Sequence, residues 1–153
     1  MRTGLISRAL LVVCSFVLSA AVLAESDPTD LIKYRKNVMS ALGGHAGAAS
    51  MIIRGKVDYA PQLIDHARSL ALTATTIKDI FPPDSELGDT NAKAAVWEKP
   101  DEFKQHAMDT QEAAAAFLKA VEAGDKAEMG KKFLALGKTC KSCHDQFRKE
   151  EKK

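Results

Sequence analysis

The stretch that decides the fold is residues 125–148, DKAEMGKKFLALGKTCKSCHDQFR, within a chain of 153 residues. Its apolar side chains recur at steps of three and four, which is the period of one face of an α-helix. Asp125, followed three residues later by Glu128, forms a capping-box pattern typical of a helix start. We therefore expect a long amphipathic helix here, of about 25 residues or roughly 37 Å. Its apolar face carries Met129, Phe133, Leu136, Cys140, Cys143, His144 and Phe147.

Three upstream segments show the same period and carry helix start or stop signals. Asp27 as N-cap and Pro28 at the first helical position mark the start of one segment, and Pro100 opens another, which Gly124 stops. The sequence has no sustained period-two alternation of the kind that indicates β-strands. We expect these three helices over residues 28–53, from near 58–61 up to Pro82, and over 100–123.

Residues 81–99 form the one long connection, because Pro82, Pro83 and Gly88 favour turns and only residues 92–97 suggest a short turn of helix. Four amphipathic helices with two short connections and one long one predict an all-α fold. The expected architecture is an antiparallel four-helix bundle with one long loop between helices 2 and 3. Trp97 and Phe103 are expected to pack at one end of it.

Residues 1–24 have the features of a cleaved export signal. Arg2 and Arg8 precede or flank an apolar run at 9–18, and small residues lead up to Ala24. The apolar run is shorter than the ~20 residues that span a bilayer, so we expect no stable membrane insertion. We expect cleavage after Ala24, a periplasmic location, and one helical domain formed by residues 25–153.

Cleavage would also leave a nearly neutral chain. Without Arg2 and Arg8, 20 basic residues stand against 20 acidic ones, which argues against non-specific nucleic-acid binding. Hydrophobic residues make up 46% of the sequence and charged residues 27%, as in ordinary globular domains. Cys14 would be removed with the signal, so two cysteines remain.

Those two cysteines lie in the motif Cys140-Lys141-Ser142-Cys143-His144, the C-x-x-C-H pattern of covalent haem attachment. Thiols three residues apart on a helix reach the same side and can each add to a haem vinyl group, while the histidine can ligate the iron. A thioredoxin-like pair would need a βαβ context, a zinc site a second pair of ligands, and a disulfide would fit poorly across one helical turn. We expect one haem c per chain, attached through Cys140 and Cys143, with His144 as proximal ligand.

The opposite axial position of the iron then decides what the haem can do. Met39, on the inward stripe of the first helix, is the best candidate to occupy or cover it. A methionine sulfur is a soft ligand that gives a six-coordinate, electron-transfer iron, whereas a methionine on an apolar stripe is often only part of the core. His45, His66 and His106 each stand alone on a helix, and we interpret them as structural histidines.

Arg35 lies one helical turn before Met39 and is a rare charge on that stripe. A buried arginine needs an anionic partner, and a haem propionate would serve. The alternative is an arginine at the edge of the stripe that extends to solvent. Arg148, one turn after His144, could do similar work or lie on the solvated face.

With these residues in place, the chain from residue 25 onward resembles the cytochrome c-prime family, the class II c-type cytochromes. The resemblance implies a periplasmic four-helix bundle with one covalent haem, His144 as proximal ligand, Arg35 near the propionates and Arg148 near the proximal histidine. It also implies that a homodimer could form through the first two helices. The matching segments are residues 30–35, 80–82, 95–97, 123–125 and 140–148.

Within that family the position of Met39 separates two kinds of protein. In one branch a bulky apolar residue covers the distal face without binding iron, and the haem binds nitric oxide or carbon monoxide. In the other branch a methionine is the sixth ligand and the protein carries electrons. Our leading expectation is a periplasmic monohaem electron carrier that serves larger redox partner proteins, and the alternative is a five-coordinate gas-binding haem protein. We expect no enzyme activity, because nothing beyond the haem supplies a catalytic constellation.

Overall fold

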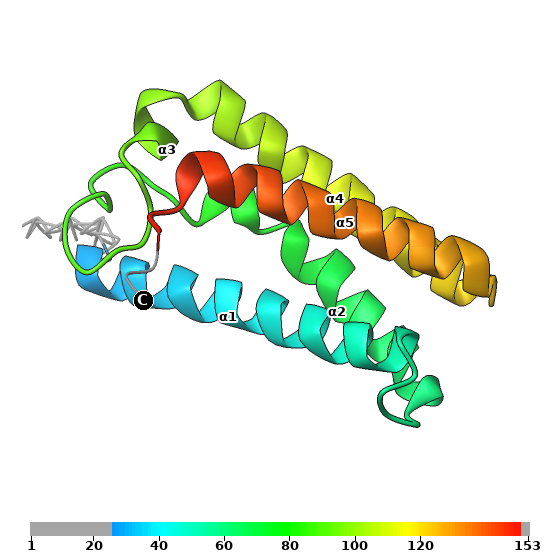
Figure 1. The fold of residues 1–153 in the computed structure, drawn as a ribbon. Helices are drawn as coiled ribbons and strands as arrows, with labels where there is room; N and C mark the ends of the chain where they lie inside the picture. Colours follow the sequence, from blue (N-terminus) through cyan, green and yellow to red (C-terminus); the bar gives the residue numbers. More distant parts are fainter. Residues whose placement is uncertain (1–25, 151–153) are drawn as a thin grey trace, which may run out of the picture.

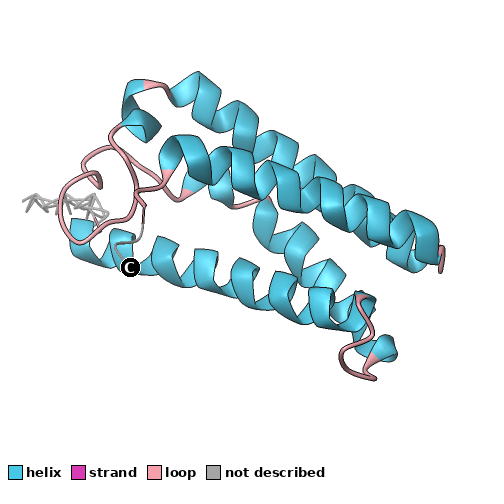
Figure 2. Cartoon of the chain, in the orientation of Figure 1, coloured by secondary structure: helices cyan, strands magenta, loops and turns pink. Residues whose placement is uncertain are grey.

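The computed structural model describes residues 26–150, and these form an antiparallel bundle of four long helices. Successive helices run in opposite directions, and the chain is helical apart from its connections (Figures 1 and 2). The expected all-α four-helix bundle is therefore confirmed. The expected export signal, residues 1–24, lies outside the described residues. The long helices are α1 (Pro28–Ile53), α2 (Leu63–Ala74), α4 (Pro100–Glu122) and α5 (Lys126–Phe147).

The start signals read from the sequence operate as side-chain caps. The Asp27 carboxylate accepts a hydrogen bond from the Thr29 amide at 2.7 Å, directly before Pro28. One carboxylate oxygen of Asp125 accepts from the amides of Ala127 and Glu128, both at 3.0 Å. Both caps satisfy amides that have no acceptor within their own helix.

The second helix is shorter than its sequence pattern predicted. It is divided into a 3₁₀ turn, η1 (Ala60–Gln62), then α2, then a second 3₁₀ turn, η2 (Ile77–Asp79). The hydroxyls of Thr75 and Thr76 donate to the carbonyls of Leu72 and Thr73 at 2.7 and 2.8 Å. These local bonds compete with the backbone hydrogen bonds of a continuing helix, so the α-helical geometry ends before Pro82.

The long loop contains the short helix α3 (Ala95–Glu98), close to the helical turn expected at 92–97, and it is fastened to the end of α5. The amide of Lys93 donates to the carbonyl of Phe147 at 2.8 Å, and the amide of Lys149 donates to the carbonyl of Asn91 at 2.7 Å. This pairing draws Arg148 into an extended conformation. As a result α5 spans 22 residues, slightly fewer than expected.

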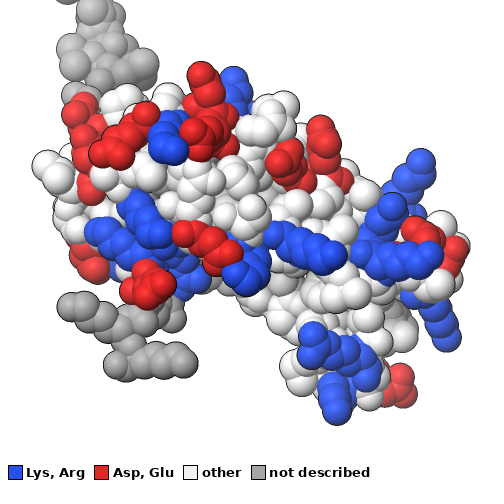
Figure 3. Space-filling model, turned by 45° about the horizontal axis from the view of Figure 1, so that its top comes forward, with Lys and Arg blue, Asp and Glu red and all other residues white. Residues whose placement is uncertain are grey.

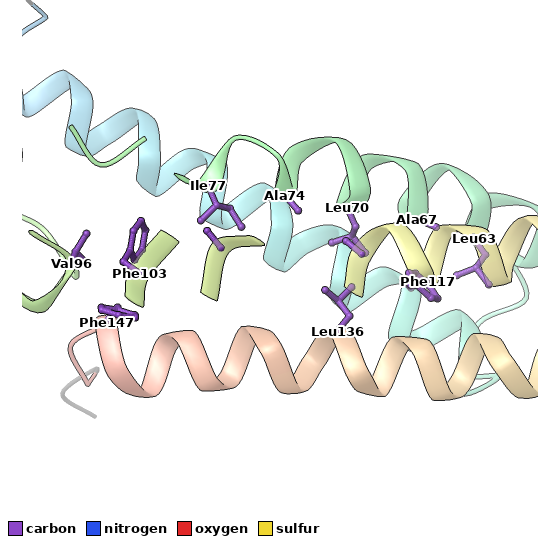
Figure 4. Close-up of a cluster of buried hydrophobic side chains, with 13 residues drawn as sticks. Leu63, Ala67, Leu70, Ala74, Ile77, Val96, Phe103, Phe117, Leu136 and Phe147 are labelled. Carbon is purple, nitrogen blue, oxygen red and sulfur yellow. The ribbon is translucent and has the colours of Figure 1, made fainter. Parts of the chain in front are cut away.

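The hydrophobic core lies mainly between α2, α4 and α5 (Figure 4). Phe117 is fully buried, with its ring centre 5.2 Å from that of Phe133 on α5. At the other end Phe103 packs edge-to-face against Phe147 at 5.3 Å and against Phe81 at 4.8 Å. Such edge contacts add to the energy of burial, so they help to hold α4 against α5. Phe103 thus packs at the bundle end, as expected.

The first helix contributes little to that core, since Ala49 is its one fully buried member of the cluster. No helix in the described range is both long enough and apolar enough to cross a membrane. Lysines, arginines and acidic residues lie side by side on the face shown in Figure 3, in keeping with the nearly balanced composition.

We predict that Asp125→Ala lowers the free energy of unfolding by about 1 kcal/mol, because two amides at the start of α5 lose their acceptor. Urea unfolding followed by far-ultraviolet circular dichroism measures the change. Asp58→Ala is the matched control, since Asp58 is exposed and lies outside the helices, and it should change stability by no more than about 0.5 kcal/mol. Equal losses in the two variants would contradict the capping role.

Candidate functional site

A cavity of about 470 Å³ lies between α1 on one side and α2, α4 and α5 on the other. Its volume falls within the range of roughly 300–1,000 Å³ that is usual for cofactor and ligand sites. The long loop closes one edge of it. Apolar side chains from all four long helices line it, among them Leu42, Leu70, Ala74, Ile77, Phe103, Ala114 and Leu136.

The two cysteines of the motif line this cavity from α5, half-buried and not bonded to each other. Burial raises the pKa of the Cys140 thiol, and burial together with neighbouring Cys140 raises the pKa of Cys143 to about 11. At neutral pH both groups are therefore thiols. Since the thiolate is the form that attacks in disulfide exchange, this environment disfavours a redox-active pair. It leaves two protonated thiols aimed into one apolar cavity.

His144 follows on the same helix, and it also lines the cavity. Desolvation lowers the pKa of its imidazole and the positive charge of Arg148 lowers it further, while the negative charge of Asp145 acts in the opposite direction. The net lowering favours the neutral ring, which is the form that binds a metal. Arg148 lines the cavity beside it.

Met39 lines the cavity from α1, the helix across from the cysteine motif. It is half-buried and packs against the hydrophobic core. The structure thus brings Met39, the two cysteines and His144, which lie about 100 residues apart in sequence, to the lining of a single cavity.

Arg35 is buried, with 2% of its surface exposed, so the alternative of an arginine extending to solvent is wrong. Its guanidinium donates to the hydroxyl and carbonyl of Ser85 at 2.7 and 2.6 Å, and to the hydroxyl of Thr90 at 2.7 Å. It also lies over the rings of Phe81 and Trp97, with 5.1 and 5.4 Å to their centres. Trp97 itself donates to the Pro82 carbonyl at 3.0 Å.

Among the described residues no carboxylate pairs with Arg35, whose partners are neutral oxygens and aromatic faces. Burial lowers the pKa of its guanidinium, and the residue also lines the cavity. A buried cation beside a cavity favours an anionic ligand group there. Ser85 and Thr90 carried no signal in the sequence, because they lie 50 and 55 residues from Arg35.

The remaining histidines lie elsewhere. His106 on α4 bonds Gln146 on α5 through its Nε2 atom at 3.1 Å, which fits its interpretation as structural. His45 and His66 were expected to stand alone, but their Nδ1 atoms are 3.0 Å apart across α1 and α2. Neither lines the cavity.

These features together fit a covalently attached haem. The cavity is apolar and of suitable size, two unpaired thiols and a neutral imidazole face it from one helix, and a buried guanidinium without a carboxylate partner suits an acidic edge of the ligand. The family model described as "Cytochrome C'" matches residues 30–148.

The chain belongs to the cytochrome c' family.

Similar proteins support this membership over most of the chain. It is 40% identical to cytochrome c' of Pararhodospirillum photometricum over 80% of this chain and 99% of that one. Cytochrome c prime from Shewanella frigidimarina has the same fold, with a TM-score of 0.78 at 28% identity, over 82% of this chain and 99% of its own. Members of this family carry a covalently attached haem c, one per chain, which confirms the expected cofactor.

Several similar solved structures are described with a gas bound, among them one with nitric oxide and one with carbon monoxide. Both are single-residue variants of cytochrome c prime from Alcaligenes xylosoxidans. The nitric oxide complex has a TM-score of 0.76 at 27% identity, over 83% of this chain and 99% of its own. The carbon monoxide-bound variant has a TM-score of 0.75 at 28% identity, over 82% and 98%.

We predict that Arg35→Lys lowers the free energy of unfolding of the holoprotein by about 2 kcal/mol, because lysine cannot supply the forked donors that reach Ser85 and Thr90 together. Guanidinium chloride unfolding measures the change. Arg68→Lys is the matched control, since the Arg68 side chain is 60% exposed on α2. A loss for Arg35→Lys no larger than that of the control would show that the loop does not depend on this contact.

Proposed function

We propose that this protein is a five-coordinate haem c protein that binds nitric oxide or carbon monoxide on the face covered by Met39. The observation that carries the proposal is the apolar lining on the α1 and α2 side of the cavity, where Met39 packs against the core. A neutral diatomic gas suits such a surface, and gas-bound relatives of the same fold support this function over that of a simple electron carrier. Gas binding was the alternative in the sequence analysis, where electron transfer was the leading expectation.

The residues on α5 would hold the cofactor. Cys140 and Cys143 would form the two thioether bonds, and His144 would supply the proximal nitrogen ligand. When bound, the haem would supply an iron that can take up a small neutral ligand. Arg148, beside His144, would disfavour the protonated imidazole and so keep that nitrogen available as a ligand.

The residues on α1 would set the other face. Arg35 would hold a propionate by its charge, while Ser85 and Thr90 keep the guanidinium fixed. Met39 would cover the distal face as an apolar lid. Its side chain is already packed against the core, so this packing does not require its sulfur to bind the iron.

Electron transfer through a six-coordinate iron is the second candidate. What favours it is that Met39, which carries a thioether, lines the same cavity as His144. In either case we propose that the protein is exported to the periplasm, loses residues 1–24, and works as one domain over residues 25–153. Periplasmic redox proteins would exchange electrons with it, and a homodimer through α1 and α2 stays a prediction.

Carbon monoxide binding tests the role of Met39 at the distal face. We expect the reduced holoprotein to bind carbon monoxide with a clear shift of its visible spectrum. In Met39→Ala the association rate should rise about tenfold, which corresponds to ~1.4 kcal/mol of steric barrier removed. Stopped-flow mixing measures it, and Met51→Ala, at a position on α1 that is 49% exposed, is the control. If carbon monoxide leaves the wild-type spectrum unchanged but shifts the spectrum of Met39→Ala, Met39 is an iron ligand and the proposal is refuted.

Haem staining tests the covalent attachment of the haem to Cys140 and Cys143. After denaturing electrophoresis the wild-type band should stain for haem, because thioether bonds survive denaturation. Cys140→Ser/Cys143→Ser should lose that stain, while Ser142→Ala, within the motif but not a thioether position, should keep it. Mass spectrometry of the mature chain measures both the added haem and the cleavage site. A stained band in the double variant would rule out these two attachment residues.

A further inference from the structure

The two histidines His45 and His66 form a pair that the haem site does not use. His45 belongs to α1 and His66 to α2, both side chains are half-buried, and neither lines the cavity. Their Nδ1 atoms are 3.0 Å apart and their ring centres 5.3 Å apart. That separation of the centres is about the largest that a 3.0 Å nitrogen contact allows, so the two nitrogens point at each other along one line.

This contact requires one nitrogen to donate and the other to accept. One Nδ1 must carry a hydrogen and donate, while the other must accept through its lone pair, so the accepting ring carries its proton on Nε2. Two imidazole nitrogens from different helices are thus held together by one shared proton. A site of this kind places two good ligands for a transition metal at one point on the surface.

We propose that His45 and His66 form a second metal site, separate from the haem, which takes divalent copper through the two Nδ1 atoms. With metal–nitrogen bonds of about 2.0–2.1 Å, adjacent ligands lie ~2.9 Å apart in a square plane and ~3.3 Å apart in a tetrahedron. The two nitrogens, 3.0 Å apart, are already within the distance range of adjacent ligands, and copper(II) has the highest affinity for such a site among the divalent first-row metals.

For two neutral rings, binding requires a change of tautomer but no net release of protons. The donor ring gives up the hydrogen on Nδ1 and gains one on Nε2, so both rings remain neutral and both Nδ1 lone pairs become available. The rings must also turn so that these lone pairs converge, and the terminal torsion of histidine is broad enough for that. Within the described residues no third His, Cys, Asp or Glu completes a cluster, so water would fill the remaining positions.

No basic residue lies one helical turn before or after either histidine on its own helix, so no positive charge at those positions opposes a cation bound to the pair. The neighbours at those positions are small, apolar or polar and uncharged: Ala41, Leu42, Ala48 and Ala49 for His45, and Gln62, Leu63, Ser69 and Leu70 for His66. Since both rings are half-buried at the surface, solvent can deliver the ion.

The test is equilibrium dialysis of the holoprotein against copper(II), with the metal counted by atomic absorption. We expect one tight equivalent in the wild type, with zinc bound more weakly, as the order of affinities for divalent metals requires. His45→Gln and His66→Gln should each weaken copper binding by tenfold or more, since even loss of an outer partner of a metal ligand costs about 10–100-fold. His106→Gln, which removes a half-buried histidine paired with Gln146, should leave it unchanged.

Electron paramagnetic resonance of copper in the wild type gives a readout that does not depend on how the variants fold. Hyperfine coupling to two imidazole nitrogens is the expected result. Coupling to fewer than two, or equal copper affinity in the wild type and in the His45→Gln/His66→Gln double variant, would overturn the proposal. The visible haem spectrum of each variant, compared with the wild type, verifies that the haem site is intact.

Discussion

The buried positive charge of Arg35, which has no carboxylate partner among the described residues, connects the first helix, the long loop and the cavity. Arg35 comes from α1, and its guanidinium donates to Ser85 and Thr90 of the long loop. The loop is in turn paired with the end of α5 through Lys93 and Phe147. Together with the packing of α1 against α2, this chain of contacts holds α1 beside the cavity.

The helices on the two sides of the cavity contribute different residues to the site. On one side, α4 and α5 pack through aromatic contacts such as Phe103 against Phe147, and α5 carries the cysteine motif. On the other side, α1 carries the residue that faces it, Met39. A haem protein of this design can change its gas affinity or its iron coordination through α1, while the attachment residues on α5 remain where they are.

The electrostatic environment also differs between the α5 side and the α1 side of the cavity. On the α5 side, desolvation and the charge of Arg148 lower the pKa of His144, which favours the neutral form of the ring. On the α1 side, the cost of burying the Arg35 charge is offset by hydrogen bonds and aromatic faces, and an acidic ligand edge would offset it further. The His45–His66 contact lies outside this division, since both rings are away from the cavity.

The sequence by itself determined the four helices, their caps at Asp27 and Asp125, and the haem motif at Cys140, Cys143 and His144, because periodicity, capping and thiol spacing are local properties. It also placed Met39 and Arg35 on one stripe. Only the tertiary structure decided what that stripe meets. Burial of Arg35, its bonds to Ser85 and Thr90, and the contact between His45 and His66 all depend on segments distant in sequence. No local pattern encodes such pairings.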